Sequence, residues 1–195
     1  CINCHVCVHS CDYKQLKIKV VNLTKAFEKH EYNIALIPTS LLSDFKSFDE
    51  LKAFIHAIKA FHFDEVVQYS DIEGYLYQQA IETSFQSDRL MLTSFCPSIN
   101  RLIKQEYPTL IDHLLPYDYP VEIAARRLRK KYQGKDIGIF SLCECVGKLT
   151  LAKEPLGKDN SQIDYALSIS RMFPHFNKRK SQQKDDIDIY RDGVK

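Results

Sequence analysis

Short apolar runs alternate along this chain with longer segments in which apolar residues recur every three or four positions. A compact apolar run is typical of a buried strand, and the three-to-four spacing is typical of an amphipathic helix. The sequence predicts strands in five segments: 16–21, 33–38, 64–69, 89–94 and 136–142. The apolar stretch at 162–170 fits either a strand or a helix.

Amphipathic helices are expected between these strands. One begins after Ser47, because Glu50 three residues later completes a capping box, and its apolar spacing continues to Ile58. Further helices are expected to include residues 76–81, 99–103 and 121–131. Strands that alternate with helices need crossover connections, which make neighbouring strands parallel and cover both faces of the sheet. The predicted fold class is therefore α/β, a mostly parallel sheet flanked by helices.

The chain is expected to have three parts. Its 195 residues are enough for one domain with a sizeable core. From Asn177 onward most side chains are charged or amides, so this end cannot bury enough apolar surface to order itself. We expect a small ferredoxin-like iron–sulfur module at 1–22, an α/β lobe at 23–176 and a polar linker or tail at 177–195.

Charge and composition narrow the function classes. Lys and Arg total 27 against 25 for Asp and Glu, so the net charge of +2 predicts neither nucleic acid nor an anionic membrane as a partner. The chain has no run of about eighteen apolar residues and does not start with a secretory signal, so we expect a soluble cytoplasmic protein. Seven cysteines, an odd number, suit metal ligation in a reducing compartment better than a disulfide framework.

Four thiols at the N-terminus follow the spacing C-x2-C-x2-C-x3-C: Cys1, Cys4, Cys7 and Cys11. Bacterial ferredoxins use this run to bind a 4Fe–4S cluster, and in two-cluster ferredoxins the fourth cysteine ligates the other cluster. We predict that these four cysteines bind iron–sulfur clusters. Because no second copy of the run is present, we expect a fragment whose other ferredoxin half lies upstream. A structural zinc site that uses His5 or His9 is the alternative.

The other three cysteines follow predicted strands. Cys96 comes after the strand at 89–94, and the proline that follows it favours the start of a helix. A thiol there faces the positive end of the helix dipole, which favours the thiolate that a metal needs. Cys143 and Cys145 follow the last of the five predicted strands. In one parallel sheet these thiols converge at the carboxyl edge, where α/β proteins bind ligands. For each thiol taken alone, the alternative is a small buried hydrophobic side chain.

Three segments carry a resemblance to a known family. They are TSFCPSINRLIKQEYPTLIDHL at 93–114, YPVEIAARRLRKKY at 119–132 and IGIFSLCECVGKLTLAKEP at 137–155. With the N-terminal thiol run, they resemble the catalytic domain of the iron-only (di-iron) hydrogenase large subunit, in a sensor-like or diverged branch. The resemblance covers residues 1 to about 175.

The resemblance implies roles for individual residues. Cys96 and Cys145 occupy the positions of two of the four cysteines that hold the cubane half of the hydrogen-activating cluster. Lys148 occupies the position of the lysine that hydrogen-bonds a diatomic ligand of the di-iron half. Phe95 stands where catalytic members have a proton-relaying cysteine, and Glu144 replaces a proline. The glycine-rich loop that carries the family's other two ligating cysteines does not occur in this sequence.

These observations predict an iron–sulfur protein that acts in electron transfer or hydrogen sensing. Its cofactor is expected to be a 4Fe–4S cluster, with a hydrogenase-type di-iron cluster only in a full-length form. Its expected partner is a redox protein or an adjoining domain of the full-length chain. Two alternatives stay open. The chain is a truncated piece of an active hydrogenase, or it is a structural or regulatory metal-binding protein without redox turnover.

Overall fold

A parallel sheet forms the centre of the molecule. The computed structural model describes residues 1–16, 21–43, 45–156, 160–170 and 172–173. Within these residues, four strands form one sheet in the order β2-β1-β3-β4, and every pair of neighbours is parallel. The strands are β1 (Tyr32–Ile37), β2 (Glu65–Gln68), β3 (Ile137–Cys143) and β4 (Tyr165–Ser168). The predicted fold class and three of the five predicted strands are confirmed, and the stretch at 162–170 contains strand β4.

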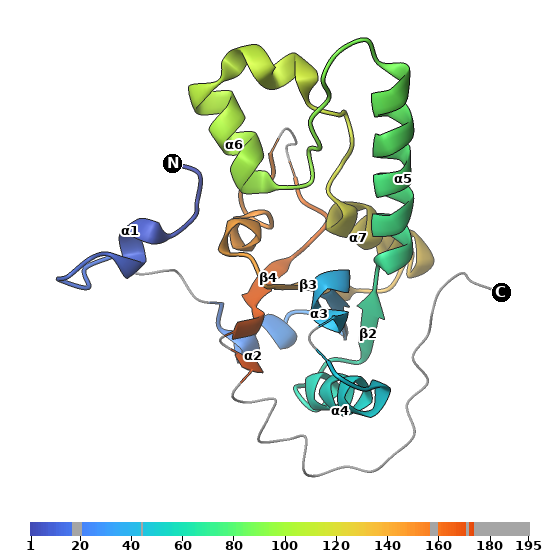
Figure 1. Ribbon diagram of the computed structural model, residues 1–195. Helices are drawn as coiled ribbons and strands as arrows, with labels where there is room; N and C mark the ends of the chain where they lie inside the picture. The colour runs from blue at the N-terminus through green and yellow to red at the C-terminus, as the bar shows by residue number, and fades with distance from the viewer. Residues whose placement is uncertain (17–20, 44, 157–159, 171, 174–195) are drawn as a thin grey trace.

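Helices connect the strands (Figure 1). The α-helices are α1 (Val6–His9), α2 (Leu23–Phe27), α3 (Thr39–Leu42), α4 (Phe48–Lys59), α5 (Ser70–Gln86), α6 (Pro97–Glu106) and α7 (Pro120–Lys131). Two 3-10 helices complete the described set, η1 (Pro108–His113) and η2 (Val146–Thr150). Helix α4 begins as the sequence predicts, because the Ser47 side chain accepts a hydrogen bond from the Glu50 N–H at 3.2 Å.

The two faces of the sheet carry separate apolar clusters. Strand side chains alternate between faces, so Ile34 and its neighbour Ala35 belong to different clusters. On one face Phe140 of β3 packs with Phe54 of α4. On the other, α5 and α7 cover the sheet, with Leu128 among the buried residues. Both faces are covered as expected for a parallel sheet, which places polar chemistry at the strand ends.

The predicted strand at 89–94 is wrong. Its backbone makes an isolated bridge between Leu92 and Leu114 and joins no strand of the sheet. Leu92 donates a hydrogen bond to the His113 carbonyl at 2.8 Å and accepts one from Leu115 at 2.9 Å. The segment therefore pairs with the end of η1, and the apolar run is too short to form a strand of its own, with Leu90 72% exposed. Two other predictions lie outside the described residues, the strand at 16–21 in its positions 17–20 and the polar tail at 177–195.

The N-terminal segment lies apart from the sheet (Figure 1). The described residues 1–16 contain one turn of helix, α1, which has no buried residue. Asn3 and His5 both adopt left-handed backbone conformations with φ of 58°, so the chain turns sharply between successive cysteines. The expected ferredoxin-like module at 1–22 and the division of the chain into three parts stay predictions.

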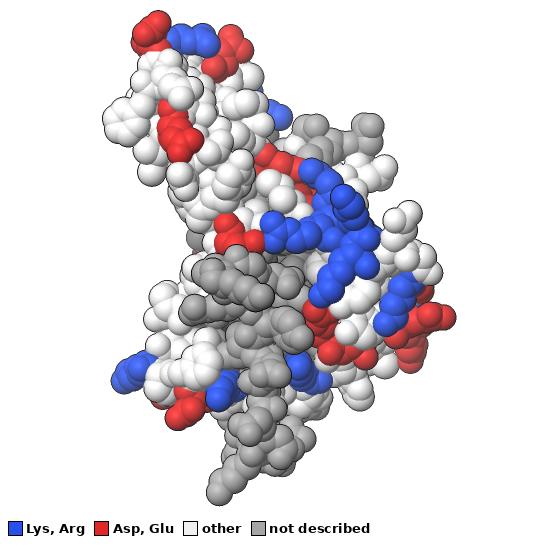
Figure 2. All heavy atoms as spheres, turned by 90° about the vertical axis from the view of Figure 1, so that its right-hand side faces the viewer, with Lys and Arg blue, Asp and Glu red and all other residues white. Residues whose placement is uncertain are grey.

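Several basic side chains of the body are paired with acidic ones. The face in Figure 2 carries Lys and Arg side chains in a band with carboxylates beside them. Helix α7 follows this pattern, since four of its basic residues form ion pairs with acidic residues of other segments, namely Arg126, Arg127, Arg129 and Lys131. No helix within the described ranges has both the length and the apolar character of a membrane span.

Candidate functional site

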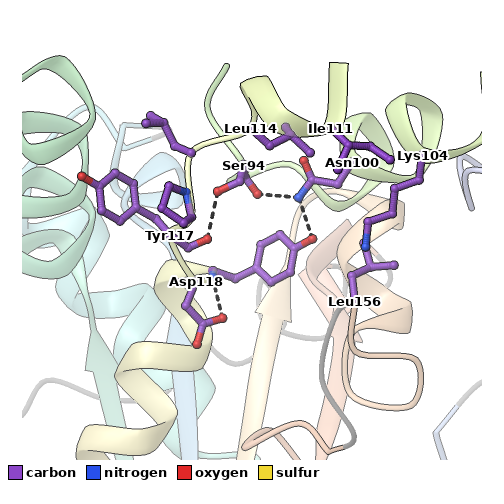
Figure 3. A pocket seen from close by; sticks show the side chains of 11 residues that line it. Ser94, Asn100, Lys104, Ile111, Leu114, Tyr117, Asp118 and Leu156 are labelled. Atoms are coloured by element: carbon purple, nitrogen blue, oxygen red, sulfur yellow. Dashed lines mark hydrogen bonds between the residues drawn. The ribbon is translucent and has the colours of Figure 1, made fainter. Parts of the chain in front are cut away.

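The Cys96 loop is held by a buried amide. Cys96 is half-buried and lies at the N-cap of α6, directly before Pro97. The Asn100 side chain donates one hydrogen bond to the Ser94 carbonyl at 2.7 Å and another to the Tyr119 hydroxyl at 2.9 Å (Figure 3). Because Asn100 is 93% buried and spans the turn, it fixes the backbone on both sides of Cys96.

The Cys145 loop begins where β3 ends. Cys143 is the last residue of β3, and Cys145 is an exposed N-cap residue of η2. The Lys148 N–H donates to the Cys145 carbonyl at 3.0 Å, which closes the turn. Cys145 and Lys148 therefore lie at the carboxyl edge of the sheet, the edge at which α/β proteins bind ligands.

The two loops lie side by side. Gly147 faces the start of α6 so closely that a Cβ there would overlap the Ser98 hydroxyl. The same Cβ would lie 3.6 Å from the Cys145 sulfur. The site thus brings the Cys96 loop to the Cys145 loop, although Cys96 does not follow a strand of the sheet. The roles of Cys96, Cys145 and Lys148 as ligands or catalytic group stay predictions.

Cys143 is buried as a neutral thiol. Its side chain lies 3.3 Å from the Ser141 hydroxyl in a hydrogen bond. Burial raises the pKa of Cys143 to about 11, against the opposing effects of the Ser141 hydrogen bond and the charge of Lys148. A protonated, buried thiol is a poor metal ligand, so the structure favours a packing role for this cysteine.

Polar residues to which the sequence assigned no role in the site gather at the same edge. The Ser40 hydroxyl donates to Glu144, which joins α3 to the loop after β3. The Thr39 N–H donates to Glu73 at 3.1 Å. Tyr69 is buried, and its pKa is raised well above the usual value by that burial and then by the charge of Glu73. The sequence contains a pattern that could have identified this group, because each member follows the end of β1, β2 or β3 by a few residues.

Phe95 is held by aromatic neighbours. Its ring meets Tyr77 of α5 edge to face, with 5.2 Å between centroids, and stacks against Tyr117 at 6.4 Å. Such pairs contribute beyond the area that they bury. The ring therefore forms part of the apolar packing between α5 and the Cys96 loop, and it has no proton to exchange.

A cavity of about 380 Å³ lies beside the Cys96 loop (Figure 3). Polar side chains from Ser94, Asn100 and Lys104 line it together with the apolar side chains of η1 and the segment after it. Neither Cys96 nor Cys145 is among its lining residues. The cavity is therefore a neighbour of the cysteine loops and not the space between them.

The N-terminal thiols are available for ligation. Cys1, Cys4 and Cys7 are exposed, Cys11 is half-buried, and all four are free thiols. Backbone N–H groups, those of Gln15 and Leu16 foremost, lower the pKa of Cys11. Cysteine thiolates hold iron–sulfur clusters and N–H groups directed at sulfur tune them, so the donor set fits such a cluster chemically. Among the described residues, however, no three Cys, His, Asp or Glu side chains converge as a metal site.

Comparison with known proteins identifies the family. The sequence profile described as iron only hydrogenase large subunit, C-terminal domain, matches residues 39–188, which is most of the chain. The chain therefore belongs to this family. No curated protein sequence matches the chain.

Solved structures of FeFe-hydrogenases share the fold. One is HydA(deltaEFG), in a structure concerned with stepwise H-cluster assembly, with a TM-score of 0.63 and 18% identity over 85% of this chain and 49% of that chain. Another is a variant of HydA1 from Chlamydomonas reinhardtii, with a TM-score of 0.61 and 16% identity over 85% of this chain and 50% of that chain. The chain thus spans about half the length of these structures. At such identities the likeness establishes the fold.

Proposed function

We propose that the chain is an iron–sulfur protein that acts in electron transfer or hydrogen sensing. The proposal includes Cys1, Cys4, Cys7 and Cys11 as ligands of iron–sulfur clusters of the 4Fe–4S type. It also includes Cys96 and Cys145 as two ligands of a cubane, with a redox protein or an adjoining domain as partner and a cytoplasmic location. When bound, such clusters supply one-electron chemistry.

The residues of the body suit a cluster that stays bound and transfers electrons without catalysing a reaction. Asn100 fixes the backbone around Cys96, and the turn between Cys145 and Lys148 fixes the second thiol. Lys148 adds a positive charge beside these loops, which acts on the neighbouring Cys143. Buried polar groups that hold ligands in place tune a metal centre without taking part in its reaction.

One observation favours relay or sensing over hydrogen turnover. The side chain that precedes Cys96 is the phenyl ring of Phe95, fixed between Tyr77 and Tyr117. A hydrocarbon ring can neither take up nor release a proton, whereas hydrogen chemistry needs a proton at the centre in every turnover. The rival function, an active hydrogenase of which this is a part, requires another proton route to that position.

Iron analysis and a turnover assay test the proposal. Anaerobically prepared protein should contain iron and acid-labile sulfide, Cys4→Ala and Cys96→Ala should each lower the iron content, and Cys143→Ser should not. The protein should produce no more hydrogen from reduced methyl viologen than Cys96→Ala does. Hydrogen production above that control would establish the enzyme, while zinc without sulfide would establish the non-redox alternative.

A further inference from the structure

A buried cation lies next to the paired cysteine loops. Arg101 of α6 has a side chain only 8% exposed. Its guanidinium donates to the Thr150 hydroxyl at 3.2 Å and to the Glu154 carbonyl at 3.3 Å, and it lies 3.5 Å from the Glu154 carboxylate. Burying a guanidinium is costly unless its charge and its N–H groups find partners, and these contacts supply them.

The N-terminal thiol segment joins the same two acceptors. The Asn3 side-chain amide donates to the Thr150 hydroxyl at 3.0 Å and to the Glu154 carboxylate at 3.4 Å. One helical turn beyond Arg101, the Gln105 amide donates to the Cys1 carbonyl at 3.3 Å. The N-terminal end of the chain accordingly lies beside α6 (Figure 1).

Thr150 uses its full hydrogen-bonding capacity in this network. A hydroxyl has one proton to donate and two lone pairs to accept with. Thr150 donates to the Gly147 carbonyl at 3.4 Å and accepts from both Arg101 and Asn3. A side chain without the hydroxyl, or a missing donor on either side, leaves buried polar groups unpaired.

Each partner lies close in sequence to a candidate ligand. Asn3 lies between Cys1 and Cys4. Arg101 is in the helix that Cys96 begins, and Thr150 ends the 3-10 helix that Cys145 begins. The network therefore ties together the three segments that carry the predicted ligands.

We propose that Arg101, Thr150 and Glu154 form the docking site for the N-terminal thiol segment and position it against the Cys96 and Cys145 loops. The docking stands on the contacts alone. Its consequence rests on the proposed function: the network would set how a 4Fe–4S cluster held by the N-terminal thiols lies relative to the Cys96 and Cys145 loops. Arg101 and Thr150 are thus positioning residues.

The docking is tested first without a cofactor. In the iron-free chain of 195 residues, Asn3→Ala should shift the nitrogen-15 NMR signals of the Arg101 side chain and the Thr150 amide. Lys153→Ala, a neighbouring exposed charge, should leave both signals in place. Unchanged signals in Asn3→Ala would overturn the docking proposal, whatever iron the protein binds. Because Asn3 is in the N-terminal segment and outside both cores, this variant keeps the body folded.

The positioning role is tested in the iron-loaded, dithionite-reduced protein. The N-terminal cluster should give an electron paramagnetic resonance signal whose line shape depends on how the network holds the thiol segment. Thr150→Val should change that line shape at unchanged iron content, and Thr150→Ser should preserve it because it keeps the hydroxyl. Equal spectra for the Val and Ser variants would overturn the positioning role. If Asn3→Ala shifts the NMR signals but the chain binds no iron, the docking stands and the proposed function fails.

Discussion

The N-terminal thiol segment and the α/β body differ in how much of their cysteines they bury, although Cys145 of the body is exposed. Residues 1–16 carry three exposed thiols on a segment whose helix has no buried residue. The body places Cys143 at the end of a fully buried strand and Cys96 at the start of an amphipathic helix. Packing therefore dictates the structure of the body, whereas a few hydrogen bonds hold the segment. The contrast separates buried residues that stabilise the fold from exposed thiols that are candidate metal ligands.

The largest expected effect is on the stability of the body. Phe140 is fully buried and packs against the rings of Phe27, Phe63 and Tyr165, with centroids 4.6 to 5.2 Å apart. Phe140→Ala should lower the free energy of unfolding in urea by about 3–5 kcal/mol, since it removes the ring and leaves a cavity.

The matched change in the N-terminal segment is Val6→Ala. Val6 is 60% exposed, so its truncation should change the free energy of unfolding by less than about 0.5 kcal/mol. Similar losses for the two variants would mean that the segment is part of the cooperative core and would remove the contrast.

Thiol reactivity should differ almost as strongly. Only the thiolate is nucleophilic, and at pH 8 a thiol of pKa about 11, as for Cys143, is ionised roughly two-hundredfold less than one of ordinary pKa about 8.5. Iodoacetamide should modify the exposed thiols first, namely Cys1, Cys4, Cys7 and Cys145, and the buried Cys143 last, as followed by mass spectrometry of native protein. The rate at Cys143 should rise with pH toward 11, because its pKa is raised and the thiolate appears only there. Early modification of Cys143 at pH 8 would show that its thiol is accessible and not buried.

A smaller effect tests the apposition of the two cysteine loops. Gly147→Ala places a methyl group against the Ser98 hydroxyl, and overpacking of this kind should cost about 1–3 kcal/mol of unfolding free energy. The Ser98→Ala change removes the hydroxyl and leaves an ordinary contact of 3.4 Å to the Ser98 Cβ. The double variant should then recover most of the loss, which denaturation of the four proteins measures. If the losses of the two single variants instead add up in the double variant, the two loops do not lie side by side.

The sequence predicted the fold better than the site, for physical reasons. Strands β1 and β3 are buried on both faces, so their apolar runs are continuous and easy to identify. The run at 89–94 is also apolar but pairs with residues at and after the end of η1. Hydrophobic periodicity is a local pattern and does not predict which distant segment a strand pairs with. The cysteine spacings identified the candidate ligands, and the resemblance identified their family. The buried Arg101 network was missed because an arginine on an amphipathic helix has no local feature that predicts burial.

The smallest expected effect separates the two regions most cleanly. Ser47 caps α4 through the hydrogen bond from the Glu50 N–H, so Ser47→Ala leaves that donor without its partner and should cost about 1 kcal/mol of unfolding free energy. Ser10→Ala is the matched control, because Ser10 is an exposed residue of the N-terminal segment and its side chain caps no helix start. Because α4 packs against the sheet and not against residues 1–16, Ser47→Ala should also leave the alkylation rates of Cys1, Cys4 and Cys7 unchanged. A change in those rates together with the loss of stability would show that the thiol segment folds with the body, and the two regions would then have to be treated as one cooperative unit.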